Sequence, residues 1–245
     1  MKIEYRQAKD SAHMMDFQNY LNKLAVSSEV KKICEVGGGA NPAIPINMIE
    51  KYGLKYTLLD ISSEELAKAP NEYHKIQADI SSPNLNLDGQ FDLIFSIMLA
   101  EHVPNGQTFH KNTWNLLRHD GYALHLFPTM YAFPFIVNQL LPEKLSNKLL
   151  GTLAPHRITD SKKLKFPAYY SWCRGPSNNQ KNKFNSLGFR VEEYIAFFGT
   201  PAYFRRSKPL NLLDEWVSSI LVKYPLPLIT SYAYVLLRKD VSLMN

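Results

Sequence analysis

A glycine-rich turn after a short apolar run constrains this chain more than any other feature. The run Lys32–Val36 leads into Gly37–Gly39, and Asn41 and Pro42 follow. Glycine adopts φ > 0 without steric cost and lets a ligand approach the backbone closely. Asn and Pro are typical of a helix start, so the pattern predicts a strand, a tight turn and a helix from about residue 43 to 52. The N–H groups of such a helix start favour a nucleotide-like ligand.

Apolar runs and amphipathic segments alternate through the first half of the chain. Besides the first strand and helix, strands are expected at 55–60, 74–79, 91–96 and 122–127, and helices at 8–25, from 62 or 63, and at 108–117. This alternation indicates a parallel sheet with right-handed crossovers. After Pro128 the regular alternation is lost. Later expected elements are a helix ending at 187, a strand at 189–198, mostly helix over 201–223 and a strand at 231–238.

Two acidic residues end consecutive predicted strands. Asp60 closes the second strand and Asp79 closes the third. An acid at the first position can accept hydrogen bonds from the two hydroxyls of a ribose, and an acid at the second reaches an adenine edge. The alternative is that both are helix caps. A dinucleotide is disfavoured, because Pro42 stands where the third glycine of G-x-G-x-x-G is expected.

These motifs, in this order, resemble class I S-adenosylmethionine-dependent methyltransferases of the small-molecule type over about residues 30–128. The matching segments are Glu35–Gly39, Leu58–Ser62, Gln77–Ile80, Phe91–Ser96 and Ala100–Pro104. The resemblance implies an α/β, Rossmann-like fold: a seven-stranded, mostly parallel sheet with an antiparallel last strand and helices on both faces. It also implies S-adenosylmethionine as the cofactor. We expect one domain over 1–245, with 1–128 as its cofactor-binding half and 129–245 as a substrate-side insertion plus the last two strands.

The resemblance further implies a set of cofactor contacts. They are Gly37 and Gly39 with the methionine part, Asp60 with the ribose, Asp79 and Ile80 with the adenine, Ser96 and Ile97 with the methyl-bearing sulfonium, and Glu35, Gly38 and Ile61 in the same site.

The sequence departs from the family pattern at two positions. Asn41 stands where many relatives have glycine, and Asn tolerates the left-handed conformation. Some related O-methyltransferases bind a metal with Glu-x-x-Glu-His. Here Met98 takes the first position while Glu101 and His102 remain, so no metal is predicted.

His102 is the first candidate for the catalytic base. It follows the strand expected at 91–96, and methyl transfer to a hydroxyl benefits from a base that removes the proton. A capping or packing role is the alternative. His156 is the second candidate, with the same alternative.

Aromatic residues and arginines gather in two later segments, 166–174 and 197–206. The substrate-binding candidates are Tyr131, Tyr169, Tyr170, Trp172, Arg174 and Tyr203. Tyr and Trp faces suit sugar rings, and Arg suits phosphate or carboxylate, although core packing explains the same residues. With the net charge of +6 they favour an acidic or phosphorylated acceptor. The second half also resembles, more loosely, methyltransferases of surface-polysaccharide synthesis.

An apolar stripe runs through the helix expected near residues 210–221, flanked by Lys208 and Lys223. We expect it to pack on the sheet, with contact to a membrane surface as the less favoured alternative.

Composition and charge disfavour several other classes of protein. The basic residues are scattered rather than clustered, which disfavours nucleic-acid binding. The sequence contains no uninterrupted run of about 18 apolar residues, so no transmembrane helix is predicted. The cysteines Cys34 and Cys173 form no disulfide framework, which fits a reducing cytoplasm. We predict a cytoplasmic O-methyltransferase acting on a small-molecule or glycan hydroxyl. The alternatives are N-methylation of a small amine and a non-catalytic cofactor-binding protein, and the oligomeric state stays open.

Overall fold

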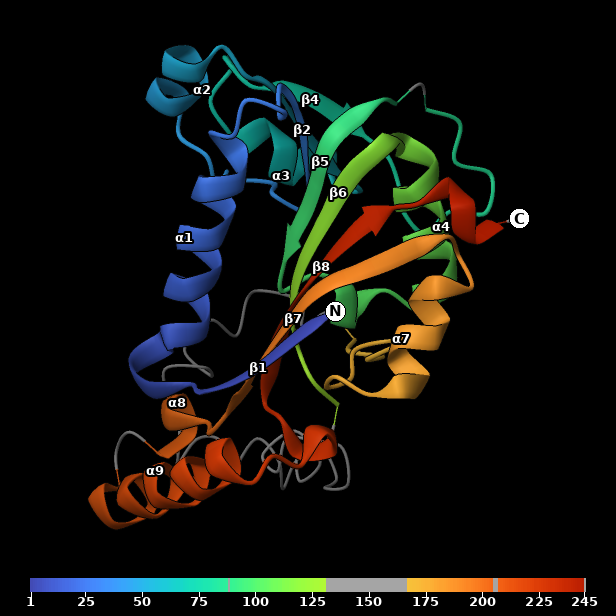
Figure 1. Ribbon diagram of the computed structural model, residues 1–245. Coiled ribbons are helices and arrows are strands. Elements are labelled where there is room, and N and C mark those ends of the chain that lie inside the picture. Colours follow the sequence, from blue (N-terminus) through green and yellow to red (C-terminus); the bar gives the residue numbers. More distant parts are fainter. Residues whose placement is uncertain (88, 131–166, 205–206, 245) are drawn as a thin grey trace.

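The computed structural model describes residues 1–87, 89–130, 167–204 and 207–244, and these form an α/β fold around one sheet (Figure 1). The strands are β1 Lys2–Gln7, β2 Lys32–Val36, β3 Lys55–Asp60, β4 His74–Gln77, β5 Phe91–Ile97, β6 Leu117–Pro128, β7 Phe189–Phe198 and β8 Tyr232–Lys239. Their order in the sheet is β1-β7-β8-β6-β5-β2-β3-β4. Among these described strands, only β8 runs antiparallel to its neighbours, β6 and β7.

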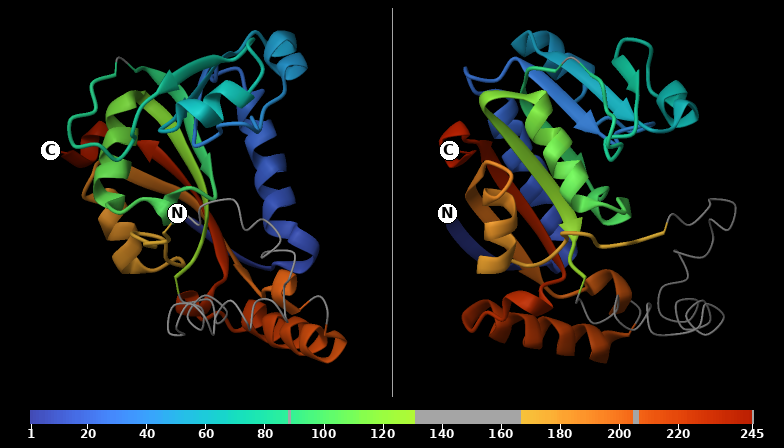
Figure 2. Two further views of the ribbon diagram at one scale, coloured as in Figure 1. Left: turned by 180° about the vertical axis from the view of Figure 1, so that it is seen from behind. Right: turned by 90° about the vertical axis from the view of Figure 1, so that its right-hand side faces the viewer.

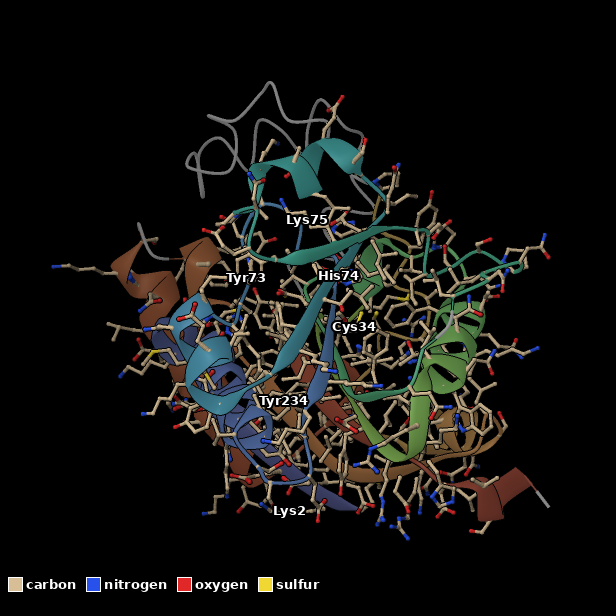
Figure 3. The ribbon with its side chains drawn as sticks, turned by 90° about the horizontal axis from the view of Figure 1, so that it is seen from above. Lys2, Cys34, Tyr73, His74, Lys75 and Tyr234 are labelled. Atoms are coloured by element: carbon tan, nitrogen blue, oxygen red, sulfur yellow. The ribbon has the colours of Figure 1, made fainter. Side chains whose placement is uncertain are left out.

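The sheet has one strand more than the seven that were expected. The extra strand is β1, which pairs in parallel with β7 from Lys2 opposite Glu193 onward. Figure 3 shows Lys2 at one edge of the sheet and His74 and Lys75 of β4 toward the other. The prediction missed β1 because none of its residues is buried. An edge strand of this kind is held by backbone hydrogen bonds to its neighbour, which leave no hydrophobic pattern in the sequence.

Helices cover both faces of the sheet (Figures 1 and 2). They are α1 Ala12–Ala25, α2 Ile46–Tyr52, α3 Ser63–Lys68, α4 Gly106–Leu116, α7 Asn178–Asn185, α8 Pro201–Phe204 and α9 Lys208–Lys223. Phe17 of α1 packs on Tyr234 of β8, whereas Phe109 of α4 packs on His125 of β6. His125 is paired with Val235, so Tyr234 and His125 point to opposite faces. The central strands are therefore buried on both sides, and Cys34 of β2 is fully buried.

The helix after the glycine turn begins later than the sequence indicated. It starts at Ile46 with Pro45 as its N-cap, so Asn41 and Pro42 do not start it and that prediction was wrong. Pro42 and Pro45 each disfavour the helical conformation in the residue before them, which keeps residues 41–44 out of a helix. The turn therefore presents glycine backbone, and not a helix N-terminus, at the carboxyl end of β2.

The helix α9 also differs from its expectation. The only buried residue of α9 is Ser218, and the apolar stripe remains exposed, so the prediction that it packs on the sheet was wrong. Short 3₁₀ turns complete the described elements: η1 Lys9–Ser11, η2 Ala100–His102, η4 Pro227–Ile229 and η5 Val241–Met244. No helix in the described ranges has the length and hydropathy needed to cross a membrane.

Candidate cofactor and acceptor site

The glycine turn has a backbone that only glycine can adopt without strain. Gly37 has φ +78° and Gly39 has φ +34°. A Cβ atom on Gly37 would lie 2.8 Å from Cδ1 of Leu99, and one on Gly38 would lie 2.5 Å from Cδ of Glu35. The amide of Gly37 donates to the carbonyl of Leu59 at 2.8 Å, which joins the turn to β3. The predicted left-handed turn is confirmed, and it leaves bare backbone at the sheet edge.

Glu35 supports this turn from within the core. Its Oε2 accepts hydrogen bonds from the Ala43 amide, at 3.0 Å, and from the Tyr56 hydroxyl. Burial raises the pKa of Glu35 to about 7, although both hydrogen bonds oppose that shift. Both hydrogen bonds to this oxygen come from the protein itself, so Glu35 anchors residues 37–43.

The carboxylate of Asp60 faces the turn from the end of β3. Its Oδ1 accepts from the Ser62 amide at 2.8 Å, which fixes the side chain in an Asx turn. Its Oδ2 lies 3.1 Å from the point where a Cβ on Gly39 would stand. Ser62 also caps α3 by accepting from the Glu65 amide at 3.1 Å. A held carboxylate beside side-chain-free backbone is the arrangement that a ribose diol needs, so these residues fit an adenosyl group. Ile61, between them, is exposed.

Asp79, the second acid, lies with Asp60 at the carboxyl ends of the parallel strands. Gln77 of β4 pairs with Asp60, Asp79 follows two residues later, and the Ala78 amide donates to the Asp60 carbonyl at 2.9 Å. Asp79 Oδ1 accepts from the amide and the hydroxyl of Ser81, at 2.8 and 2.7 Å. Ile80, at the next position, is buried, and its carbonyl accepts from the Asn112 side chain at 2.8 Å.

The strand-end residues Ser96 and Ile97 occupy different environments. The Ser96 side chain is fully buried, and its Oγ lies 2.8 Å from Nδ1 of His125, so the hydroxyl points toward β6. Ile97 is half-buried, and after it the chain turns at Met98, which has φ +52°. A left-handed non-glycine residue costs free energy and is common beside functional sites.

His102 lies just beyond this turn, in η2. Its Nδ1 is 2.9 Å from the carbonyl oxygen of Pro167. A carbonyl oxygen can only accept, so Nδ1 carries a proton, and in the neutral ring Nε2 is then the nitrogen with the lone pair. The imidazole has 36% of its surface exposed. The ring is thus oriented by backbone and presents a basic nitrogen near the carboxyl end of β5.

The segment 167–170 closes on η2 through the backbone of Glu101. The Glu101 carbonyl accepts from the amides of Tyr169, at 2.7 Å, and Tyr170, at 3.0 Å. Two predicted substrate residues are therefore placed beside His102, although they are far from it in the sequence. Tyr169 is half-exposed, whereas Tyr170 is buried and left-handed at φ +50°.

The Glu101 side chain is a feature that the sequence indicated only through the incomplete metal motif. Glu101 is 4% exposed, and its Oε1 lies 3.8 Å from Nε2 of His102. Its Oε2 is buried without a hydrogen-bond partner. Burial raises the pKa of Glu101 to about 8, so the neutral carboxyl is favoured at neutral pH.

The other substrate candidates play structural roles where they are described. Trp172 stacks on His110 with ring centroids 5.6 Å apart, and Tyr203 is buried. Arg174 donates to the carbonyls of Tyr170, at 2.6 Å, and Cys173, at 3.0 Å. Tyr131 and the second candidate base, His156, lie outside the described residues.

Comparison with known proteins finds similarity to methyltransferases over part of this chain. Residues 34–125 match a family model described as a methyltransferase domain. A putative sarcosine dimethylglycine methyltransferase from Galdieria sulphuraria superposes with a TM-score of 0.54 at 12% identity, covering 94% of this chain and 86% of that one. Comparison with curated proteins gave no match.

Two further solved structures show the same fold. The StiE O-MT, residues 961–1257, has a TM-score of 0.55 at 14% identity, covering 94% of this chain and 75% of that one. Coclaurine N-methyltransferase bound to N-methylheliamine and SAH has a TM-score of 0.54 at 16% identity, covering 94% and 73%. The similar folds thus include enzymes named for oxygen and for nitrogen acceptors.

Proposed function

We infer that this chain, which carries a class I methyltransferase domain and takes S-adenosylmethionine as its cofactor, methylates a hydroxyl group of a small molecule or glycan. The observation that carries the proposal is the hydrogen bond between His102 Nδ1 and the Pro167 carbonyl. This bond leaves Nε2 as the basic nitrogen at the sheet edge that also holds the glycine turn and Asp60.

Different residues of the chain would hold the cofactor, take the proton and bind the acceptor. The turn Gly37–Gly39 and the Asp60 carboxylate would hold the cofactor, which supplies a methyl group on a sulfonium when bound. His102 Nε2 would take the proton of the acceptor hydroxyl as that oxygen is methylated. The half-exposed ring of Tyr169 beside His102 offers a face on which a sugar or another partly apolar acceptor can stack.

The rival function is methyl transfer to an amine, and Glu101 is the observation that favours it. Its Oε2 is buried without a partner and its Oε1 lies 3.8 Å from His102 Nε2. A cationic ammonium group bound beside this carboxyl would favour its ionised form and pair with it, and an amine needs less help than a hydroxyl to lose its proton.

Two measurements separate these functions. Titration with S-adenosylhomocysteine by calorimetry tests the cofactor site, and the absence of binding at millimolar ligand would contradict both functions. Transfer of a radiolabelled methyl group to a panel of hydroxyl and amine acceptors tests the chemistry, with mass spectrometry identifying the methylated atom. Exclusive N-methylation would replace the proposal by its rival. Cofactor binding with no transfer to any acceptor or cell extract would favour the non-catalytic alternative.

A further inference from the structure

The helix α9 has its amphipathic faces reversed relative to the protein body. A helix on the surface of a globular protein normally turns its apolar side toward the core. In α9 the side toward the body is mostly polar, with Ser218 as its only buried residue, and the outer side is apolar and exposed. The exposed apolar residues of α9 and of the segment after it are Leu210, Leu212, Leu213, Trp216, Val217, Ile220, Tyr224, Leu226, Leu228 and Ile229, here called the α9 apolar surface.

Polar contacts attach the inner side of α9 to the rest of the protein. Asp214 Oδ2 accepts from the Thr200 amide at 2.9 Å, and Ser218 is buried against Gly199. The Gln7 side chain donates to the Glu215 carbonyl at 2.9 Å. These bonds fix the helix on the carboxyl ends of β1 and β7, so the outward direction of its apolar side is built into the docking.

The exposure of the α9 apolar surface is large, and Leu212, Trp216 and Ile220 follow one another at four-residue spacing, which places them on one side of the helix. Trp216 is 62% exposed and Leu212 is 66% exposed. Beyond the helix, Tyr224 and Leu228 are 65% and 63% exposed. Monomeric soluble proteins rarely leave a contiguous apolar patch of this kind without a partner.

The charges around the α9 apolar surface indicate which kind of partner it would bind. Lys208 and Lys223 stand at the two ends of α9, and both are exposed. The acids of the helix are turned inward, where Asp214 is bonded to Thr200 and Glu215 Oε2 lies 3.8 Å from Lys9 Nζ. The outer side therefore carries apolar groups and positive charge. A second copy packed antiparallel on it would bring Lys208 of one chain to Lys223 of the other, which is unfavourable.

We propose that the α9 apolar surface binds peripherally to a membrane of anionic phospholipids. Leu, Ile, Val and Trp side chains enter the boundary between acyl chains and headgroups, while the lysines contact lipid phosphates. Trp and Tyr suit this boundary because each ring is apolar with one polar atom. In Figures 1 and 2 α9 lies at the same end of the molecule as the carboxyl ends of β5 and β7. The bound protein would thus turn its acceptor side toward the lipid.

Flotation of the full chain with vesicles tests this proposal. We expect binding to vesicles of phosphatidylcholine with about 30% phosphatidylglycerol, and at least about tenfold weaker binding to pure phosphatidylcholine. The double variant Leu212→Gln/Trp216→Gln is expected to lose at least about tenfold in binding to the anionic vesicles. The matched control is Leu243→Gln, which removes an exposed apolar side chain of η5, near the C-terminus and away from α9 in Figure 1.

Tryptophan fluorescence gives a second readout that does not depend on the loss of binding. Trp114 and Trp172 are half-buried, so the exposed Trp216 is the tryptophan that a lipid surface would cover. Anionic vesicles are expected to shift the emission of the wild type to shorter wavelength and to leave that of Trp216→Phe unshifted, while Trp216→Phe still floats.

The outcomes that overturn the proposal are distinct. No flotation with either vesicle contradicts it, because another part of this chain would then cover the surface. A stable dimer in light scattering that the double variant dissociates would assign the surface to a second copy. Thermal melting of each variant separates loss of binding from loss of fold. The proposal does not depend on methyl transfer, since none of these measurements uses it.

Discussion

The carboxylate of Glu35 accepts a hydrogen bond from the amide of Ala43 at 3.0 Å, which ties the end of β2 to the far side of the glycine turn. Glu35 is 3% exposed, and the same oxygen also accepts from the Tyr56 hydroxyl of the neighbouring strand. The turn is thus supported by one buried side chain, and its bare glycine backbone needs no side chain of its own.

Replacing Glu35 by alanine is expected to weaken both the fold and the cofactor site. The change leaves the Ala43 amide and the Tyr56 hydroxyl without their acceptor, which costs about 2–3 kcal/mol of unfolding free energy. The released loop should also lower the affinity for S-adenosylhomocysteine about tenfold. Calorimetric titration and thermal melting at pH 6, where Glu35 is largely neutral, measure the two effects. Glu50→Ala, on the exposed side of α2, is the control and should change neither.

Gly39→Ala is expected to damage the cofactor site specifically. Its Cβ would stand 3.0 Å from Cβ of Glu65 and 3.1 Å from Asp60 Oδ2, at a φ of +34°. The Asp60 carboxylate must therefore move, and the affinity for S-adenosylhomocysteine should fall at least about tenfold.

The matched control for that variant is Gly53→Ala. Gly53 has φ +61° at the end of α2, and an added Cβ meets no atom within 4 Å. It introduces comparable backbone strain, about 1 kcal/mol, away from the site. We expect a lower melting temperature with unchanged ligand affinity. Equal loss of affinity in both variants would show that strain alone explains the effect.

His102→Ala is expected to reduce kcat for a hydroxyl acceptor by about 10²–10⁴-fold, because the transferred proton loses its acceptor. The affinity for S-adenosylhomocysteine should stay within about twofold, since His102 does not belong to the turn or to Asp60. His119→Ala is the control, because His119 is exposed near the start of β6. Full activity of His102→Ala would point to an amine acceptor.

Glu101→Gln is expected to change the pH dependence of stability. The pKa of Glu101 is raised from the ordinary 4.5 to about 8, so the folded state holds a proton that the unfolded state releases. The contribution of Glu101 to the free energy of unfolding is fully present below about pH 4.5 and is lost as the pH rises toward 8. Relative to the variant, the wild type should lose up to about 1.4 kcal/mol of unfolding free energy per pH unit in that window.

Chemical denaturation at pH 5, 6.5 and 8 measures this difference. Glu35 has a raised pKa as well, but it titrates in both proteins and cancels in the comparison. A difference that stays constant with pH would mean that Glu101 is ionised in the folded protein throughout.

Local sequence pattern was sufficient to predict the central strands and the glycine turn. The strands that contain Cys34 and Ile94 are buried on both faces and read as apolar runs, and the left-handed glycines were evident from their own chemistry. Asp60 and Asp79 could be placed because the carboxyl ends of parallel strands share one edge.

The sequence by itself determined the α/β alternation, the glycine turn and the two strand-end acids, since each follows from local propensity and hydrophobic period. Tertiary structure alone decided the pairing of β1 with β7, the seating of Tyr169 and Tyr170 on Glu101, and the outward direction of the apolar side of α9. These depend on backbone hydrogen bonds and on contacts between distant segments. Such contacts are set by the free energy of the whole packing and leave no period in the local sequence.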